Sequence, residues 1–108
     1  LTEKTFRASM MHPFILAASP GSLQMFKDFG FKTFPYLFDE SYDDIENHTE
    51  RLRFVMNQVH TIIKMDENKF MNKIKESYQN VAYNQKHWMN LHNTLENYLV
   101  SVFEEMVE

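Results

Sequence analysis

Apolar residues recur at helical spacing through the second half of the chain. Asn47 is a good N-cap, and Glu50 three residues later completes a capping-box pattern, so we expect a helix over about 48–64. The apolar stripe of this helix consists of Leu52, Val55, Met56, Val59, Ile62 and Ile63. A stripe of this width predicts a core-facing surface, so an aspartate at Leu52 or Val59 should unfold the domain.

A second stripe follows Asp66 and predicts a helix over about 66–106. Its members are Phe70, Ile74, Tyr78, Val81, Trp88, Leu91, Leu95, Leu99, Val102 and Met106. One unbroken rod of this kind would be about 65 Å long, roughly twice the width of a globule of this chain length. We therefore expect either a bend or break near 83–87, where polar residues interrupt the stripe, or a packing partner outside the chain. The wide apolar face favours a symmetric homodimer.

The first third of the chain has a mixed pattern, because both glycines and all three prolines lie before residue 36. Helices are expected over about 2–11 and 20–29, with Ser19-Pro20 starting the second helix and Gly30 ending it. Two apolar stretches, about 13–18 and 31–34, are typical of short buried strands. The predicted fold class is α/β and helix-rich, with the two strands paired in parallel as a small β unit.

Composition and charge restrict the classes of partner. The chain has 108 residues, enough for one domain, and no cysteine, which excludes a disulfide framework or a thiolate site. The net charge is −4 without any basic stripe, so we expect no nucleic-acid partner. The longest purely apolar run, 14–18, is too short to span a bilayer, so we expect no membrane partner and a reducing, cytoplasmic location. The chain begins at Leu1, which is typical of a piece cut from a longer protein.

Three stretches of small and charged residues fall at one edge of the predicted β unit. They are Thr2-Glu3-Lys4, Ser19-Pro20-Gly21-Ser22 and Asp39-Glu40-Ser41. Ligands of open parallel sheets bind beyond the carboxyl ends of the strands, and a helix N-terminus there suits a phosphate group. From spacing alone, the simpler alternative is preferred: Glu3 matches the dipole of its helix, Lys4 is solvated, and Ser-Pro-Gly-Ser is an ordinary helix start.

The acidic run 39–44 invites a metal interpretation, but it lacks the glycine and the spacing of a calcium-binding loop. We expect these carboxylates to order the loop first, to contact a nucleotide second and to bind metal third, and we assign no metal site. The five histidines form no i, i+4 ligand pair, and we assign no catalytic residue.

These motifs resemble parts of glycosyltransferases. Thr-Glu-Lys followed by an aromatic residue, a proline and an apolar run is similar to the nucleotide-sugar-binding segment of fucosyltransferase-like enzymes, which are built from two Rossmann domains. Most of the chain also resembles the C-terminal part of uncharacterised glycosyltransferase-like proteins of marine phages and bacteria. The matching features are Gly21-Ser22, the Gly30 to Phe34 run, the Asp39 to Asp43 run, Arg51 or Arg53, and His92-Asn93.

The resemblance implies a partial Rossmann-like nucleotide-binding unit over 1–47 and a C-terminal helical segment over 48–108. The chain would be the donor-binding fragment of a nucleotide-sugar-dependent glycosyltransferase, with Glu3 on the ribose and Lys4 on the diphosphate. The residues expected to contact the nucleoside diphosphate-sugar are Glu3, Lys4, Arg7, Ser19, Gly21, Ser22, Asp39 and Glu40. Because the acceptor-binding half would be missing, the fragment should not be catalytic alone. The alternative is a non-enzymatic helical module that self-associates.

Overall fold

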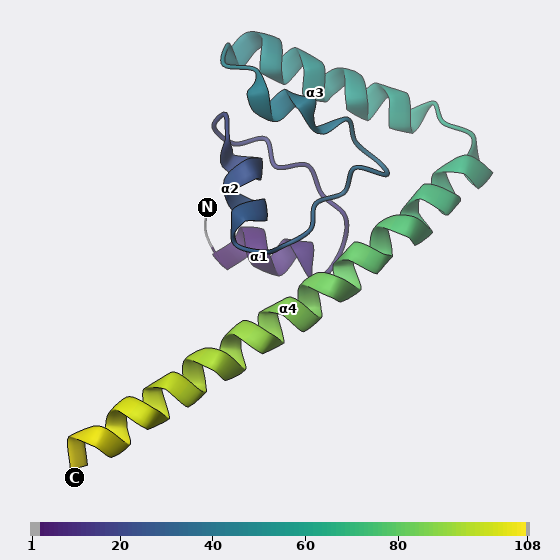
Figure 1. Cartoon of the computed structure of the whole chain (residues 1–108). Helices are drawn as coiled ribbons and strands as arrows, with labels where there is room; N and C mark the ends of the chain where they lie inside the picture. The colour runs from purple at the N-terminus through teal and green to yellow at the C-terminus, as the bar shows by residue number, and fades with distance from the viewer. Residues whose placement is uncertain (1–2, 108) are drawn as a thin grey trace.

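The computed structural model describes residues 3–107, which form helices and irregular segments only (Figure 1). In chain order the elements are α1 (Glu3–Ser9), α2 (Ser22–Asp28), the 3₁₀-helix η1 (Glu40–Asp44), α3 (His48–Ile63) and α4 (Glu67–Val107). No residue of this described part lies in a β-strand. The predicted α/β fold class is therefore wrong, and so is the partial Rossmann-like unit over 1–47, because the parallel pair at its centre does not form.

The two stretches predicted as strands run through the structure as extended chain whose backbone is bonded by side chains. The amide of Lys32 donates to Asn84 Oδ1 at 2.8 Å, and Asn84 Nδ2 donates to the Lys32 carbonyl at 2.9 Å. Asn80 Nδ2 donates to the Thr33 carbonyl at 2.8 Å, and the Leu16 amide donates to the Tyr42 hydroxyl at 3.1 Å. Buried backbone groups must be paired, and here α4 and η1 supply the partners that a neighbouring strand would supply.

The apolar character of these stretches reflects an aromatic core rather than a sheet. Phe6, Phe14, Phe26, Phe31 and Phe34 contact one another with ring centroids 5.0–5.8 Å apart, in stacked, tilted and edge-to-face arrangements. Such pairs contribute beyond the area they bury, about 0.5–1.5 kcal/mol each. The core thus lies between α1, α2, the 31–34 segment and the first half of α4 (Figure 1).

The boundaries of α2 differ from the sequence expectation at one end. The helix starts at Ser22 after Gly21, whose φ is +82°, so Ser19-Pro20 does not begin it. The other end agrees, because Gly30 follows the helix with φ +92° and its amide bonds the Lys27 carbonyl. Of the predicted apolar side, Leu23 and Phe26 are buried, but Phe29 is 55% exposed.

Helix α3 packs on η1 with a narrower face than its stripe predicts. Val55 is buried, whereas Leu52 is 61% exposed and Ile63 is also exposed. The expectation that Leu52 is core is therefore wrong. The predicted cap is confirmed, since Asn47 Oδ1 accepts a hydrogen bond from the Glu50 amide at 3.0 Å.

Helix α4 is one continuous helix of 41 residues, and it gives the molecule its long dimension of 63 Å. The predicted bend or break near 83–87 does not occur. The polar residues there bond the N-terminal third instead: Gln85 Nε2 donates to the Met10 carbonyl at 2.7 Å, and His87 Nε2 lies 2.8 Å from the Phe29 carbonyl. Beyond this point the helix projects away from the rest of the chain (Figure 1).

Candidate functional site

The N-terminus of α2, expected to hold a phosphate, instead holds a carboxylate of the chain itself. Asp43 Oδ1 accepts from the Leu23 amide at 2.9 Å, and its Oδ2 accepts from the Gln24 amide at 3.0 Å. The Gly21 amide donates to the Asp43 carbonyl at 3.0 Å. Asp43 is buried, so it caps α2 from within the fold. Of the predicted contacts here, Ser19 and Gly21 are exposed and Ser22 is half-buried.

The predicted residues of α1 lie apart from this helix start. Phe6 of α1 packs against Phe26 and Phe29 in the C-terminal half of α2, at centroid distances of 5.5 and 5.8 Å. Glu3, Lys4 and Arg7 are exposed, and Glu3 forms an i, i+4 ion pair with Arg7 at 3.9 Å. Figure 1 shows α1 at the end of α2 opposite to its start. The structure therefore does not bring Glu3 and Lys4 together with Ser19–Ser22.

Asp39 and Glu40 order the loop that contains them. Asp39 Oδ1 accepts from the Ser41 amide at 3.1 Å, and this bond, with the Ser41 hydroxyl bond, lowers the pKa of Asp39. Glu40 accepts from the Thr33 hydroxyl at 2.7 Å and from the Phe34 amide at 3.2 Å. It also lies 3.9 Å from Lys27 Nζ. Both carboxylates thus perform the loop-ordering role that the sequence ranked first.

Neither a metal site nor a membrane span is found within residues 3–107. No group of three or more His, Asp or Glu side chains in that part of the chain is placed to hold a metal ion. None of its helices combines the length and the hydropathy needed to cross a bilayer.

The feature that internal contacts leave unexplained is the distal half of α4. We define its distal face as the apolar side chains that share one side of the helix after residue 87: Trp88, Leu91, Leu95, Tyr98, Leu99, Val102, Phe103 and Met106. Seven of its eight members are exposed, with values from 41% at Trp88 to 79% at Met106, and Val102 is half-buried. The opposite side carries Asn90, Asn93, Asn97, Ser101 and Glu104. The helix is thus amphipathic where it packs on nothing in its own chain.

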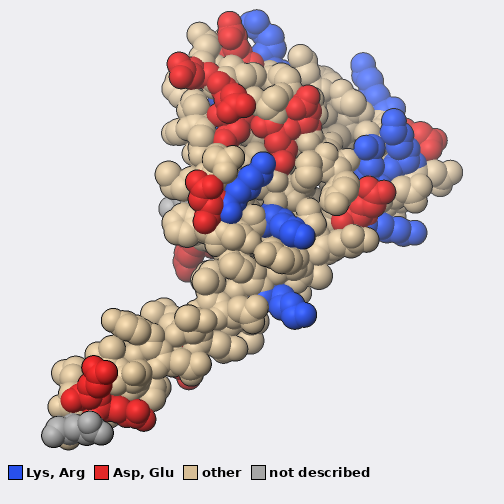
Figure 2. Space-filling view, viewed as in Figure 1, with Lys and Arg blue, Asp and Glu red and all other residues tan. Residues whose placement is uncertain are grey.

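Charge is also unevenly placed along α4. Residues 88–107 contain Glu96, Glu104 and Glu105 but no Lys or Arg, whereas Lys86 precedes them directly. Lys32 lies over the Tyr83 ring, 4.3 Å from its centroid, at the start of the projecting part. Figure 2 shows the rod as a largely uncharged surface with acidic side chains at its tip, whereas the compact part carries both acidic and basic side chains.

Comparison with known protein families, with curated proteins and with solved structures finds no match to this chain. The resemblance to glycosyltransferases stays a prediction from the sequence. The apolar stripe expected at the end of α4 is, in contrast, observed to be exposed in the structure.

Proposed function

We propose that the chain is a non-enzymatic helical module that self-associates through the distal face of α4. The observation that carries the proposal is the row of large apolar side chains on a helix that extends beyond its own core. Contiguous exposed apolar patches of this extent are uncommon on monomers and mark interaction surfaces.

A second copy of the chain is the occupant that this face fits best. Trp88, Leu91, Leu95, Tyr98 and Val102 are spaced alternately by three and four residues, the pattern with which two helices pack side by side at a shallow angle. An identical helix presents the same spacing, so the contact is self-complementary about a two-fold axis.

The charge distribution favours an antiparallel pair. In a parallel pair, the acidic tips of the two copies would lie at the same end of the contact, with Glu105 at the edge of each distal face, and would repel each other. In an antiparallel pair, the two tips lie at opposite ends of the contact, each beside residues 88–91 of the other copy, which include no acidic side chain. Separation of the like charges would fix the direction of the contact more than its strength.

We expect the self-association of two copies through the distal face to be of moderate affinity. Burying much of eight apolar side chains on each of two helices contributes on the order of 15 kcal/mol. Loss of translational and rotational freedom costs about 4–15 kcal/mol. The surplus is small, so we expect association in the micromolar range rather than an obligate dimer.

Sedimentation equilibrium over micromolar concentrations tests this proposal. We expect the wild-type chain to pass from the 13.0 kDa monomer to twice that mass as concentration rises. Leu95→Glu should remain monomeric, while Asn97→Glu, which adds the same charge on the opposite side of the helix, should behave as wild type. A single 13.0 kDa species at all concentrations would exclude self-association.

Nucleoside diphosphate binding is the expectation from the glycosyltransferase resemblance, and it gives a measurement that separates the two functions. If Lys4 contacts a diphosphate, Lys4→Ala should weaken binding by roughly 1–3 kcal/mol in a calorimetric titration. Absence of heat at millimolar nucleoside diphosphate would reject donor binding by this chain and leave the self-association result unaffected.

A further inference from the structure

A buried arginine on α3 has no negative partner in the described part of the chain. Arg51 is 6% exposed, and its Nε donates to the Tyr42 carbonyl at 3.1 Å. Its Nη2 is buried and forms no hydrogen bond. A buried guanidinium is strongly disfavoured unless it is paired, so this group presents an unused donor and an uncompensated charge.

The neighbouring carboxylates are already engaged elsewhere. Asp43 bonds the amides of Leu23 and Gln24, and Glu40 bonds Thr33, Phe34 and Lys27. The ion pairs within 4.0 Å among residues 3–107 are Arg7–Glu3 and Lys27–Glu40, and neither includes Arg51. The positive charge at this point of the fold is therefore free to attract an anion.

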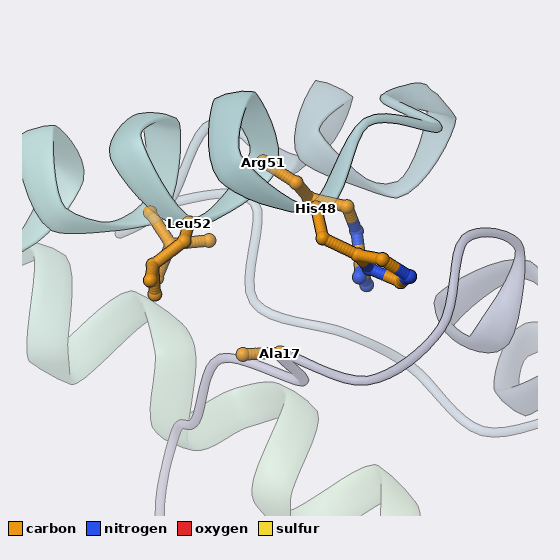
Figure 3. A pocket seen from close by; sticks show the side chains of 5 residues that line it. Ala17, His48, Arg51 and Leu52 are labelled. Carbon is orange, nitrogen blue, oxygen red and sulfur yellow. The ribbon is translucent and has the colours of Figure 1, made fainter.

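Arg51 lines a small hollow between α3 and the extended segment that contains Ala17. Figure 3 shows the Arg51 and His48 side chains extending from the first turn of α3 toward the segment that contains Ala17, while Leu52 lies further along the helix. Val55 and Ala17 complete the lining. Both basic side chains thus come from the N-terminal turn of a 16-residue helix, where the helix dipole adds partial positive charge.

The size of the hollow suits a small anion. Its volume is about 130 Å³, and it is partly open to solvent. This space accommodates a tetrahedral oxyanion, and the rest of a small ligand can extend into solvent. Arginine is suited to such a group, because its planar fork donates two parallel hydrogen bonds to phosphate oxygens.

We propose that this hollow is a phosphate-binding site in which the Arg51 guanidinium and the His48 ring hold the oxyanion. The ligand is a phosphate group, either free inorganic phosphate or the terminal group of a small phosphomonoester. The site is separate from the distal face of α4, so its test is independent of self-association.

Thermal unfolding in phosphate, compared with sodium chloride at equal ionic strength, tests the site. A ligand that binds only the folded chain raises Tm by about 5 °C for each tenfold increase in concentration above Kd. His48→Ala should weaken phosphate binding roughly tenfold, because one charge-assisted hydrogen bond is lost. His60→Ala, at the other end of the same helix and also exposed, should respond to phosphate as wild type does.

Arg51→Met keeps an apolar stem of similar length and should abolish the phosphate response. If this variant does not fold, the Arg51 Nε–H signal of the wild-type chain gives the answer in an NMR titration with inorganic phosphate. The proposal is overturned if that signal does not shift, if phosphate and chloride give equal Tm up to about 50 mM, or if His48→Ala and wild type respond identically. Repeating the titration with glycerol 3-phosphate separates the two sources: tighter binding than inorganic phosphate identifies a phosphomonoester site, and weaker binding a free-phosphate site.

Discussion

Asn84 of α4 pairs with the backbone of Lys32 as a neighbouring strand would. The side-chain amide accepts from the Lys32 N–H at 2.8 Å and donates to the Lys32 carbonyl at 2.9 Å, across 52 residues of sequence. Its Nδ2 also donates to the Ser9 carbonyl at 3.2 Å. One buried amide therefore joins α4 to two segments of the N-terminal third, and both contacts depend on it.

Asn84→Leu should lower the free energy of unfolding more than any other single amide substitution on α4. The change leaves the Lys32 and Ser9 backbone groups unpaired, at about 1–3 kcal/mol each, so we expect a loss of roughly 3–5 kcal/mol. Urea unfolding followed by circular dichroism measures it. Asn90→Leu, on an exposed part of the same helix, is the matched control and should change the free energy by less than about 0.5 kcal/mol. Equal effects of the two variants would show that the Asn84 hydrogen bonds do not contribute to the free energy of unfolding.

Asp43→Asn should weaken the start of α2. The aspartate accepts from two amides, Leu23 and Gln24, whereas an asparagine side chain has one acceptor oxygen and no charge to match the helix dipole. We expect the free energy of unfolding to fall by about 1–2 kcal/mol. Asp44→Asn removes the same charge at the exposed neighbouring position and serves as the control. If the two variants unfold at the same urea concentration, the cap contributes nothing to stability.

Tyr42 should make the fold sensitive to alkaline pH. Burial raises the pKa of Tyr42 to about 12 from 10.0, so the folded state holds the phenolic proton more tightly than the unfolded state does. The associated stability is complete below pH 10 and is lost as pH rises through 12.

Tyr42→Phe should remove this alkaline loss, and it should also cost about 1–3 kcal/mol at neutral pH because the Leu16 amide loses its acceptor. Urea unfolding at a series of pH values between 9 and 12 gives both effects. The exposed Tyr98 supplies the control, since Tyr98→Phe should leave the pH profile unchanged. A Tyr42→Phe profile that still falls like wild type would assign the alkaline loss to other groups.

The two glycines should tolerate alanine differently. Both have positive φ, +82° at Gly21 and +92° at Gly30, so each substitution carries a backbone penalty of about 1–2 kcal/mol. A Cβ at Gly30 would also lie 2.6 Å from His87 Nε2, while a Cβ at Gly21 meets no atom within 4 Å. We therefore expect Gly30→Ala to be the more destabilising variant in thermal unfolding.

A double-mutant cycle isolates the His87 contact. His87→Ala removes the ring that a Cβ at residue 30 would strike, so adding it to Gly30→Ala should recover part of the lost stability. Additive effects of the two substitutions would mean that backbone strain alone accounts for the loss at Gly30.

The sequence predicted the parts of this fold that depend on neighbours in the chain. The helices expected over 48–64 and 66–106 are found at His48–Ile63 and Glu67–Val107, and the Asn47 cap is present. Caps and helical periodicity act within a few residues, so they can be read locally. The 13–18 and 31–34 stretches could not be assigned this way, because an apolar extended segment looks the same whether its partner is a strand or a side chain such as Asn84.

The same limit applies to the candidate site. Which amides a carboxylate bonds depends on packing across long sequence separations, so the acidic run could be assigned a loop-ordering role but not the capping of α2 by Asp43. Arg51 gave one signal that was missed: it lies four residues before the buried Val55, on the same side of α3. A charged residue on a core-facing stripe indicates either an ion pair inside the fold or a binding site for a charged ligand.

Because α4 is continuous from Glu67 to Val107, its distal half is a cantilever. The compact part holds the helix at several points, from Lys73, whose Nζ donates to the Tyr36 carbonyl at 3.0 Å, to His87, whose Nε2 lies 2.8 Å from the Phe29 carbonyl. Residues 88–107 extend about 30 Å beyond the last of these contacts at 1.5 Å per residue. A sideways force on this arm is therefore resisted first by the bonds of Gln85 and His87, at the edge of the attachment.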